Sequence, residues 1–528
     1  SGGLLAVSND SPDNIFILLL SSDDTPLLYK IDLVSENGEL LATGQTDDFP
    51  LENWQGFYDF VFEVSPDDAD IMFAGTSSLF KTTNGGDSFS LVGGYGGSFP
   101  IHPDAQFMML LENNKSWLAT DGGLTFSSDN FTNTNNAQSK NNNLIGSDFW
   151  GFDQGWNEDI VVGGRYHNGN TAITDFYQEK ALRMGGAESP TGWVLQGKSR
   201  HVAFDDLGAG WILPQTAESS AEGRFPFNKH PNMDEYGGRR GNMVFHPNYY
   251  EVIYLGEGNG FWKSSDMGTS FELLHDFGKR VRYLQISFSD PEIIYADIVN
   301  EGLFKSEDGG YTWQQKPSLT DGSNGQASWG GRLQFAISPN DANTIYACLN
   351  NGIWSSDIGK VFKSTDGGDS WVDWTANLNP YCETLVVQPD EQGNDIVYLF
   401  TSSLNDQDGN CFIRRQGENN WSVYGIDFPA GKKINHALAF FRDSKLRVAG
   451  TGGVWENSLD NTNFLPIIQP WVNRPVIDCF LDTIQLNDHS IIDHEGCSWS
   501  WSIEPEPEYI ENENIRNPKV VLGEIGSY

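Results

Sequence analysis

A short stretch that recurs along the chain constrains the fold more than any other feature. Four copies run over residues 81–89, 263–271, 305–313 and 363–371, and the last reads KSTDGGDSW. The shared pattern is Ser/Thr-x-Asp/Asn-x-Gly-x-Ser/Thr followed by Trp or Phe. An Asp or Asn side chain closes a tight turn by accepting backbone N–H groups, and glycine supplies a positive φ. Each copy therefore predicts a strand, a tight turn and a second strand, and the repetition predicts a repeat architecture.

The turn residues are expected to have a structural role. A fifth, less complete copy covers residues 119–126, so the expected turn positions are Asn84, Asp121, Asp266, Asp308 and Asp366. The pattern resembles the Asp-box (BNR) repeat of β-propellers, found in sialidases, xyloglucan-cleaving glycoside hydrolases and sortilin-type receptor ectodomains. The resemblance implies that these turns lie at the periphery of the blades, away from the ligand face. Calcium binding by their carboxylates is the alternative.

The predicted fold class is all-β. Adjacent copies are roughly 40 to 60 residues apart, which suits four-stranded blades. The interval between Phe126 and Ser264 has room for two or three blades without the repeated stretch. We expect roughly eight to ten blades over residues 1–470, and the chain begins in the middle of the pattern, which suggests further sequence upstream.

From about Trp471 the repeated stretch no longer occurs, and residues 471–528 are expected to form a second domain. Trp499 and Trp501, expected on a central strand, with Asn517-Pro518 and Gly526-x-Tyr528, resemble the start of a PKD-type, immunoglobulin-like β-sandwich, expected to continue past Tyr528. A box-bearing propeller followed by such a domain is similar to secreted Bacteroidota surface proteins of the type IX secretion system.

The composition excludes some partners. The chain has 32 Lys and Arg against 72 Asp and Glu, a formal charge of −40, which repels nucleic acid and anionic membranes. No apolar run approaches the ~20 residues of a membrane helix. The five cysteines show no metal-ligand spacing. Cys479 and Cys497 are the candidate pair for a disulfide, and we expect a secreted or cell-surface protein.

Catalytic signatures are weak. A sialidase needs an arginine cluster that clamps the substrate carboxylate, and no arginine precedes the first repeated stretch. Neither G-x-S-x-G nor HExxH occurs. An inverting glycosidase needs two carboxylates about 6.5–9.5 Å apart. Asp153, Asp159 and Asp175, near the aromatic-rich SDFWGFDQGW, are the candidates.

A cation-rich sector gives the candidate ligand-binding residues. About half of the Lys and Arg lie between residues 160 and 335, often beside aromatics, amides or histidines. Such a sector suits a carboxylated or polar glycan, or an acidic peptide. The alternative is that these arginines pair with surplus carboxylates and hold loops. The candidates are Arg165, His167, Arg200, Arg239, Arg240, Arg280, Arg282 and Arg332.

These observations favour a non-catalytic binding or adhesion module of a larger protein, recognising a glycan or a protein on its propeller face. One alternative is a secreted, xyloglucanase-like glycoside hydrolase that uses two cleft carboxylates. Another is a structural component of a surface secretion or motility machine, with outer-membrane secretion machinery as the partner. No cofactor and no catalytic metal are expected, calcium being the one candidate structural ion.

Overall fold

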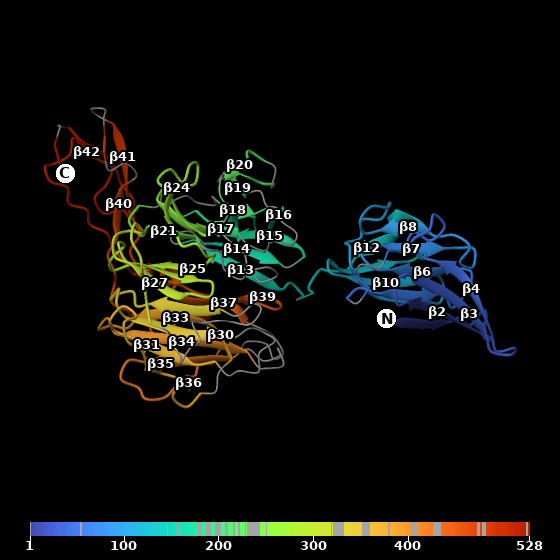
Figure 1. The fold of residues 1–528 in the computed structure, drawn as a ribbon. Helices are drawn as coiled ribbons and strands as arrows, with labels where there is room; N and C mark the ends of the chain where they lie inside the picture. The colour runs from blue at the N-terminus through green and yellow to red at the C-terminus, as the bar shows by residue number, and fades with distance from the viewer. Residues whose placement is uncertain are drawn as a thin grey trace. The chain divides into compact units, whose positions relative to one another are not determined.

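The structure is a computed structural model of the whole chain. It describes residues 2–52, 55–56, 58–144, 146–155, 159–165, 167–177, 181–185, 192–195, 202–205, 210–214, 217–219, 222–227, 229, 243–249, 251–317, 319, 332–350, 359–378, 381–402, 410–425, 434–472, 476–477, 482–523 and 526–527. The fold is built from strands, nearly all in four-stranded antiparallel sheets in which successive strands are neighbours (Figure 1). It divides into two compact units, unit 1 (Ser1–Gly146) and unit 2 (Ser147–Tyr528).

Unit 1 contains three such sheets in its described residues. The first has β1 (Gly3–Val7), β2 (Asn14–Leu20), β3 (Pro26–Asp32) and β4 (Asn37–Thr43); the second has β5 (Val61–Val64), β6 (Met72–Gly75), β7 (Leu79–Thr82) and β8 (Ser90–Gly93); the third has β9 (Ala105–Leu111), β10 (Lys115–Thr120), β11 (Gly123–Ser127) and β12 (Ala137–Ser139). A 3₁₀ turn, η1 (Thr134–Asn136), precedes β12.

Unit 2 contains six four-stranded sheets of this kind and one three-stranded sheet among its described residues before the C-terminal segment. Their strands are β13 (Phe149–Gln154), β14 (Ile160–Arg165), β15 (Gly169–Thr174) and β16 (Leu182–Gly185); β17 (Gly192–Val194), β18 (Val202–Asp205), β19 (Gly210–Leu213) and β20 (Phe225–Phe227); β21 (Met243–Phe245), β22 (Ile253–Glu257), β23 (Gly260–Ser264) and β24 (Glu272–Asp276); β25 (Val281–Ile286), β26 (Ile294–Ile298), β27 (Gly302–Ser306) and β28 (Gln314–Gln315); β29 (Arg332–Ile337), β30 (Ile345–Asn350), β31 (Val361–Ser364) and β32 (Val372–Asp373); β33 (Tyr381–Pro389), β34 (Asp395–Ser402), β35 (Asn410–Arg415) and β36 (Ser422–Val423); and β37 (Ile434–Phe440), β38 (Lys445–Gly450) and β39 (Gly453–Ser458). Two 3₁₀ turns, η2 (Asp175–Tyr177) and η3 (Phe441–Asp443), lie between strands.

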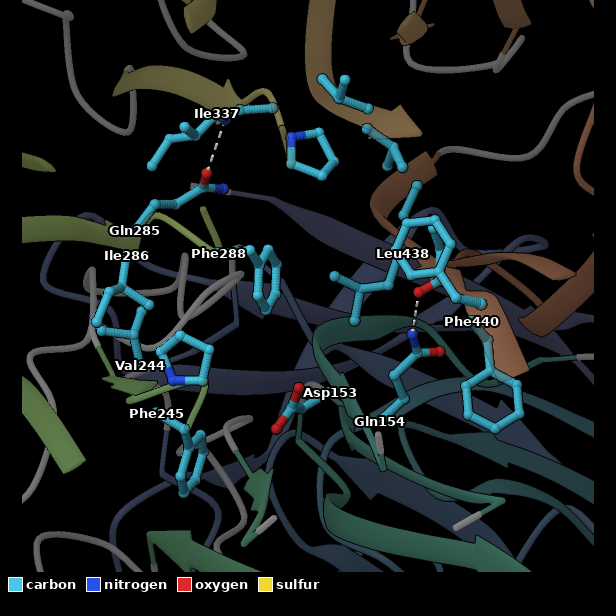
Figure 2. Close-up of a pocket in the computed structure, with 18 of the residues that line it drawn as sticks. Asp153, Gln154, Val244, Phe245, Gln285, Ile286, Phe288, Ile337, Leu438 and Phe440 are labelled. Carbon is cyan, nitrogen blue, oxygen red and sulfur yellow. Dashed lines mark hydrogen bonds between the residues drawn. The ribbon is translucent and has the colours of Figure 1, made fainter. Parts of the chain in front are cut away.

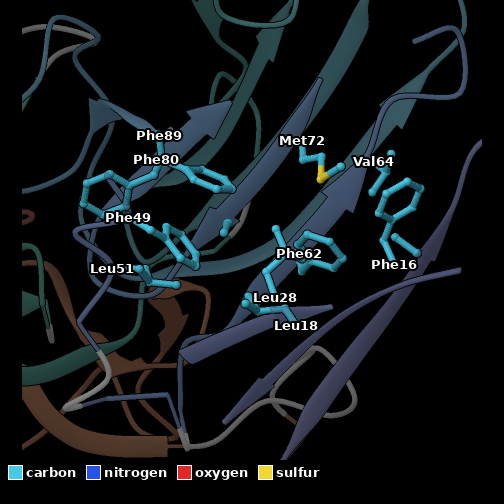
Figure 3. Packing of buried hydrophobic residues seen from close by; sticks show 12 residues of the cluster. Phe16, Leu18, Leu28, Phe49, Leu51, Phe62, Val64, Met72, Phe80 and Phe89 are labelled. Atoms are coloured by element: carbon cyan, nitrogen blue, oxygen red, sulfur yellow. The ribbon is translucent and has the colours of Figure 1, made fainter. Parts of the chain in front are cut away.

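The strands follow from the alternation of buried and accessible side chains. In β2, Phe16, Leu18 and Leu20 are buried while the residues between them are less so, as the period of two of a strand requires. Their buried face packs on the second sheet of unit 1, and Figure 3 shows this cluster with Phe62 and Met72. The ring centroids of Phe49, which precedes β5, and Phe89, in the β7–β8 turn, lie 4.1 Å apart in a stacked pair in the same cluster.

The seven sheets of unit 2 form a closed β-propeller. The first strands of most neighbouring sheets pack side by side around a centre, and β37 packs against β13 to close the ring. The sheets that begin with β17 and β21 meet through a shared apolar cluster that includes Trp193 and Met243. Hydrogen bonds join the two ends: Gln154 Nε2 donates to the Ala439 carbonyl at 2.7 Å, and Asn435 Nδ2 donates to the Phe149 carbonyl at 2.8 Å. The all-β, multi-bladed propeller that the sequence predicted is confirmed. Among the described residues the closed ring has seven sheets and unit 1 has three more, where one propeller of roughly eight to ten blades was expected.

The boundary after Gly146 was not foreseen, because the sequence analysis treated residues 1–470 as one propeller. Each sheet carries the same strand and turn pattern, and that pattern does not tell which sheets share a ring. Within the described residues, no helix is long and apolar enough to cross a membrane.

The C-terminal segment forms a small sheet with the order β40-β41-β43-β42. Its strands are β40 (Pro470–Val472), β41 (Thr483–Asp488), β42 (Tyr509–Ile510) and β43 (Lys519–Val521). Gln469 Nε2 donates to the Phe288 carbonyl at 3.1 Å, which fixes the segment to the ring. Trp499 and Trp501 do not lie on a central strand, contrary to expectation. Their indole N–H groups instead donate to Asp488 and to the carbonyls of Ile515 and Arg516, and these contacts hold an irregular loop.

Candidate functional site

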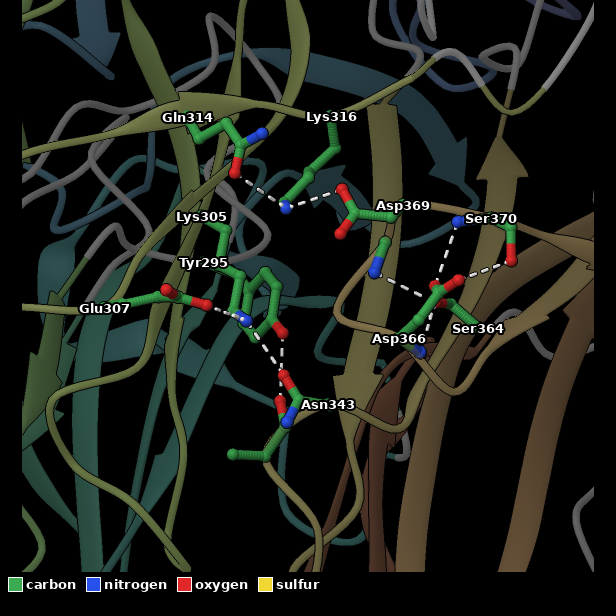
Figure 4. A network of polar contacts seen from close by, with 12 residues as sticks. Tyr295, Lys305, Glu307, Gln314, Lys316, Asn343, Ser364, Asp366, Asp369 and Ser370 are labelled. Carbon is green, nitrogen blue, oxygen red and sulfur yellow. Dashed lines mark hydrogen bonds and ion pairs between the residues drawn. The ribbon is translucent and has the colours of Figure 1, made fainter.

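The repeated turns connect the third and fourth strands of their sheets. In the turn between β31 and β32, the Asp366 carboxylate accepts the Ser370 amide at 2.9 Å, the Ser370 hydroxyl at 2.5 Å and the Ser364 hydroxyl at 2.8 Å (Figure 4). These bonds, led by that from the Ser370 hydroxyl, lower the pKa of Asp366 to about 2. Asp266 and Asp308 make the same set of contacts. In the turn between β7 and β8, Asn84 accepts the Ser88 amide at 3.1 Å. These hydrogen bonds show that the Asp and Asn side chains at these positions close the turns.

Asp121 lies in a different kind of turn, between the second and third strands, β10 and β11. The contacts typical of the repeated turns occur eight residues later in the same sheet. Asp129 accepts the Ser127 hydroxyl at 3.0 Å, and Ser127 accepts the amide of Phe131 at 2.8 Å. Phe131 has a φ of +50° where the other turns have glycine. The sequence pattern required that glycine, so it selected the wrong turn in this sheet.

Lysines connect neighbouring repeated turns. Lys305 contacts Glu307 at 2.5 Å and Asn343 at 2.8 Å, and Lys316 contacts Asp369 at 2.9 Å (Figure 4). The Lys305 and Lys316 side chains are almost fully buried, whereas Glu307 and Asp369 are exposed. The Lys305–Asn343 hydrogen bond and the Lys316–Asp369 ion pair join adjacent sheets, whereas the Lys305–Glu307 pair lies within one sheet.

The first candidate carboxylate, Asp153, faces a cavity of about 290 Å³ inside the ring of unit 2. The cavity lies where the first strands end, and Phe245, Phe288 and Phe440 contribute much of its lining (Figure 2). Asp153 accepts the amide of Val194 at 2.9 Å. Burial raises the pKa of its carboxyl to about 7, because the apolar surroundings penalise the charged form.

The other two candidates, Asp159 and Asp175, line a separate groove of about 450 Å³. The groove lies where the first and last sheets of the ring meet. Arg447, only 3% exposed, pairs with Asp159 at 2.5 Å and with Glu456 at 2.6 Å. The indole of Trp455 also lines the groove. The structure therefore brings Asp159 and Asp175 together and places Asp153 elsewhere.

The structure describes only some of the predicted cationic residues. Arg200, Arg239 and Arg240 lie outside the described residues, as does the side chain of Arg332, whose backbone starts β29. Arg282 is 8% exposed and forms an ion pair with the fully buried Asp297, with Nε and Oδ2 2.9 Å apart.

The remaining cationic candidates lie at one end of the ring. Arg165 ends β14, donates to the Asn168 carbonyl at 3.1 Å and has a pKa lowered by burial and by Arg183. His167 follows in the same turn, and Arg280 precedes β25. For Arg165 and Arg282, the contacts agree with arginines that hold loops and pair with carboxylates.

A β-bulge recurs near the start of the first strand of several sheets. In each case one extra residue interrupts the pairing with the second strand. A bulge re-aims side chains and is frequent beside functional sites. The sequence carries no common residue at this position, so pattern matching does not reveal it. The inserted residues are Gln106 in unit 1 and Trp150, Arg282, Glu383 and Asn435 in unit 2.

The predicted disulfide stays a prediction. Cys497 carries a free thiol whose Sγ lies 2.6 Å from the Asp493 carbonyl, and Cys479 lies outside the described residues.

Comparison with known proteins identifies the fold alone. The sequence matches no protein-family model and no curated protein. A crystal structure of an ancestral GH74 enzyme aligns with a TM-score of 0.59 and 12% identity, over 88% of this chain and 73% of that one. A GH74 enzyme of Niastella koreensis aligns at TM-score 0.23, with 12% identity over 96% and 78%.

The third similar structure is PorZ, an essential bacterial surface component of the type-IX secretion system of Porphyromonas gingivalis. It aligns at TM-score 0.29, with 11% identity over 92% of this chain and 78% of PorZ.

Proposed function

We propose that the chain is a non-catalytic recognition module that binds a glycan in the groove at the ring closure of unit 2. The observation that carries the proposal is the composition of this groove. Asp159 and Glu456 are 40% and 45% exposed and are held from below by the buried Arg447. Carboxylates fixed in this way accept hydrogen bonds from sugar hydroxyls, while the Trp455 indole offers an apolar face to a sugar ring.

The size and electrostatics of the groove suit a neutral or hydroxyl-rich ligand. Its volume of about 450 Å³ lies in the range of small-ligand sites. The net charge of −40 disfavours polyanions, in agreement with a ligand other than nucleic acid.

We also propose that the repeated turns are of the Asp-box type, that the C-terminal segment is PKD-like, and that the protein is secreted or displayed on a type IX-secreting bacterium.

Binding to a polysaccharide panel, with hydrolysis measured in parallel, tests this function. We expect binding without cleavage, and Trp455→Ala to weaken it at least tenfold. Tyr311→Ala is the matched control, since Tyr311 is 54% exposed and does not line the groove. Equal affinity of the Trp455→Ala variant and the unmodified chain would refute the groove as the site.

The second candidate function is a glycoside hydrolase, and Asp153 is the observation in its favour. A carboxyl with a pKa of about 7 is suited to act as a general acid. Asp153 faces the cavity of the ring, whereas Asp159 and Asp175 line the separate groove. A hydrolase mechanism would therefore need a second carboxylate other than Asp159 and Asp175. Cleavage of any β-glucan that is lost in Asp153→Asn would establish this function and overturn the first.

A further inference from the structure

Three carboxylates gather at one end of the sheets of unit 1. Asp59 lies two residues ahead of β5, Asp104 immediately precedes β9, and Asp121 lies in the β10–β11 turn. The Asp121 amide donates to the Asp104 carbonyl at 3.3 Å. Carboxylate oxygens of Asp104 and Asp121 lie within 4.8 Å of each other. The cluster therefore joins the second and third sheets of this unit at the end opposite the repeated turns.

Asp59 is the unusual member of the cluster. Its side chain is fully buried, and neither of its carboxylate oxygens has a hydrogen-bond partner. Burial, followed by the adjacent Asp104 carboxyl, raises the pKa of Asp59 to about 7, and the charge of Asp121 adds a smaller effect. A buried charge without a partner is costly, and a second carboxylate beside it adds repulsion. Either a proton or a cation must compensate for this arrangement.

The neighbours of Asp59 are held in place by the surrounding chain. Asp121 accepts the Tyr58 hydroxyl at 3.0 Å on Oδ2 and the Gln106 amide at 3.0 Å on Oδ1. Asp104 is 4% exposed and has a φ of +65°, a conformation that a non-glycine residue adopts at some cost. The carboxylates are thus fixed close together despite their mutual repulsion.

We propose that Asp59, Asp104 and Asp121 form a site for a hard divalent cation, Ca²⁺, in unit 1. Oxygen-only ligands suit Ca²⁺ and do not suit Zn²⁺ or copper, which prefer nitrogen and sulfur. The ion would neutralise the buried carboxylates and connect the starts of β5 and β9 with the β10–β11 turn. Its role would be to stabilise unit 1, separately from glycan binding by unit 2.

Calorimetric titration of the full chain with Ca²⁺ after removal of metals tests the site. We expect one site with a dissociation constant of about 10⁻⁴ to 10⁻³ M, in the range of extracellular calcium modules. Asp59→Asn should weaken this site at least tenfold. Asp47→Asn is the matched control, because Asp47 is an exposed carboxylate of the same unit.

Thermal unfolding separates the loss of a ligand from the loss of the fold. In EDTA, Asp59→Asn should unfold at a higher temperature than the unmodified chain, because the substitution relieves repulsion. Added Ca²⁺ should raise the melting temperature of the unmodified chain and leave the variant unchanged. Should Asp59→Asn fail to fold, Asp121→Asn, at a more accessible position, replaces it.

Two results would overturn the proposal. The first is a Ca²⁺ isotherm that Asp59→Asn and Asp121→Asn leave unchanged. The second is a calorimetric titration in which the metal-free, unmodified chain shows no binding of Ca²⁺ up to millimolar concentrations.

Discussion

The two units use the same kind of sheet with different consequences. In unit 2 the ring is closed, so each sheet has a neighbour on both faces, and the inner contacts continue from β37 to β13. In unit 1 the middle sheet is packed on both sides. The first sheet, in contrast, exposes Leu5 and Val7, each 61% accessible, and the third exposes Phe107, 55% accessible. Closure of a ring, and not strand pattern, decides whether the second apolar face is buried.

The units also treat buried charge differently. In unit 2 the buried Asp297 is paired with Arg282, while in unit 1 the buried Asp59 lies beside Asp104, another carboxylate. The first arrangement is complete within the polypeptide, and the second calls for an external proton or cation. The four predictions that follow test this contrast.

The largest effect is expected for Arg282→Met. Removal of the guanidinium leaves the Asp297 carboxylate buried and uncompensated, which costs about 3–5 kcal/mol. Denaturant unfolding, followed by probes in each unit, should show a loss confined to unit 2. The double variant Arg282→Met/Asp297→Leu should recover most of it. Equal destabilisation of both units would show that they unfold as one and would remove the contrast.

A smaller loss is expected for Tyr346→Phe. The Tyr346 hydroxyl donates to the buried Asp395 at 2.9 Å, and Ser338 supplies the other hydrogen bond to that carboxylate. Loss of a hydrogen bond to a buried charged group costs about 1.5–3 kcal/mol. Tyr311→Phe, at an exposed tyrosine, is the control, and chemical denaturation is the measurement. If both variants are equally stable, the Tyr346 hydrogen bond to the buried Asp395 contributes nothing measurable to the free energy of unfolding.

The repeated turns should give a smaller, pH-dependent effect. The folded pKa of Asp366 is about 2, below its ordinary value of 3.8, so its contribution is fully present above about pH 4. That contribution is lost as the pH falls through 2. Asp366→Asn should therefore lower the melting temperature slightly at pH 7, by less at pH 2, and not at all well below pH 2. A difference that persists unchanged at pH 2 would assign the effect to shape and not to charge.

The smallest change in stability is expected from Leu5→Lys combined with Val7→Lys in β1. Both side chains are already exposed, so the free energy of unfolding should change by no more than about 0.5 kcal/mol per site. Binding of a hydrophobic dye and self-association should both fall, because an exposed apolar edge strand is adhesive. A large loss of stability would mean that this face is covered in solution.

Local turn chemistry could be read from the sequence, and this explains which predictions succeed. The strand and turn pattern correctly predicted the propeller, and Asp266, Asp308 and Asp366 form the contacts that their residue types suggest. The pattern failed in the third sheet, where Phe131 adopts a positive φ in place of glycine. Because phenylalanine seldom adopts a positive φ, nothing in the residue type at position 131 indicates this turn.

The candidate groove could not be predicted in the same way. Asp159 and Arg447 are 288 positions apart and meet only because the last sheet closes on the first. The number of sheets in the ring fixes which distant segments become neighbours, and no local motif records that number. Asp159 and Asp175 were selected from the sequence, but Arg447, Trp455 and Glu456 were not.

The recurring β-bulge adds to the first strand of a sheet one residue that lies outside the regular pairing with the second strand. The inserted residue differs in each sheet where it occurs, and among them are the aromatic Trp150, the cationic Arg282 and the anionic Glu383. Because the Cα register of the two strands skips this residue, its replacement leaves the pairing of the other residues in the sheet unchanged. A propeller built in this way can change its surface chemistry where the inserted residue is accessible, as at Trp150, so new binding preferences can evolve there without a new fold, whereas the buried Arg282 and Glu383 are constrained by their surroundings.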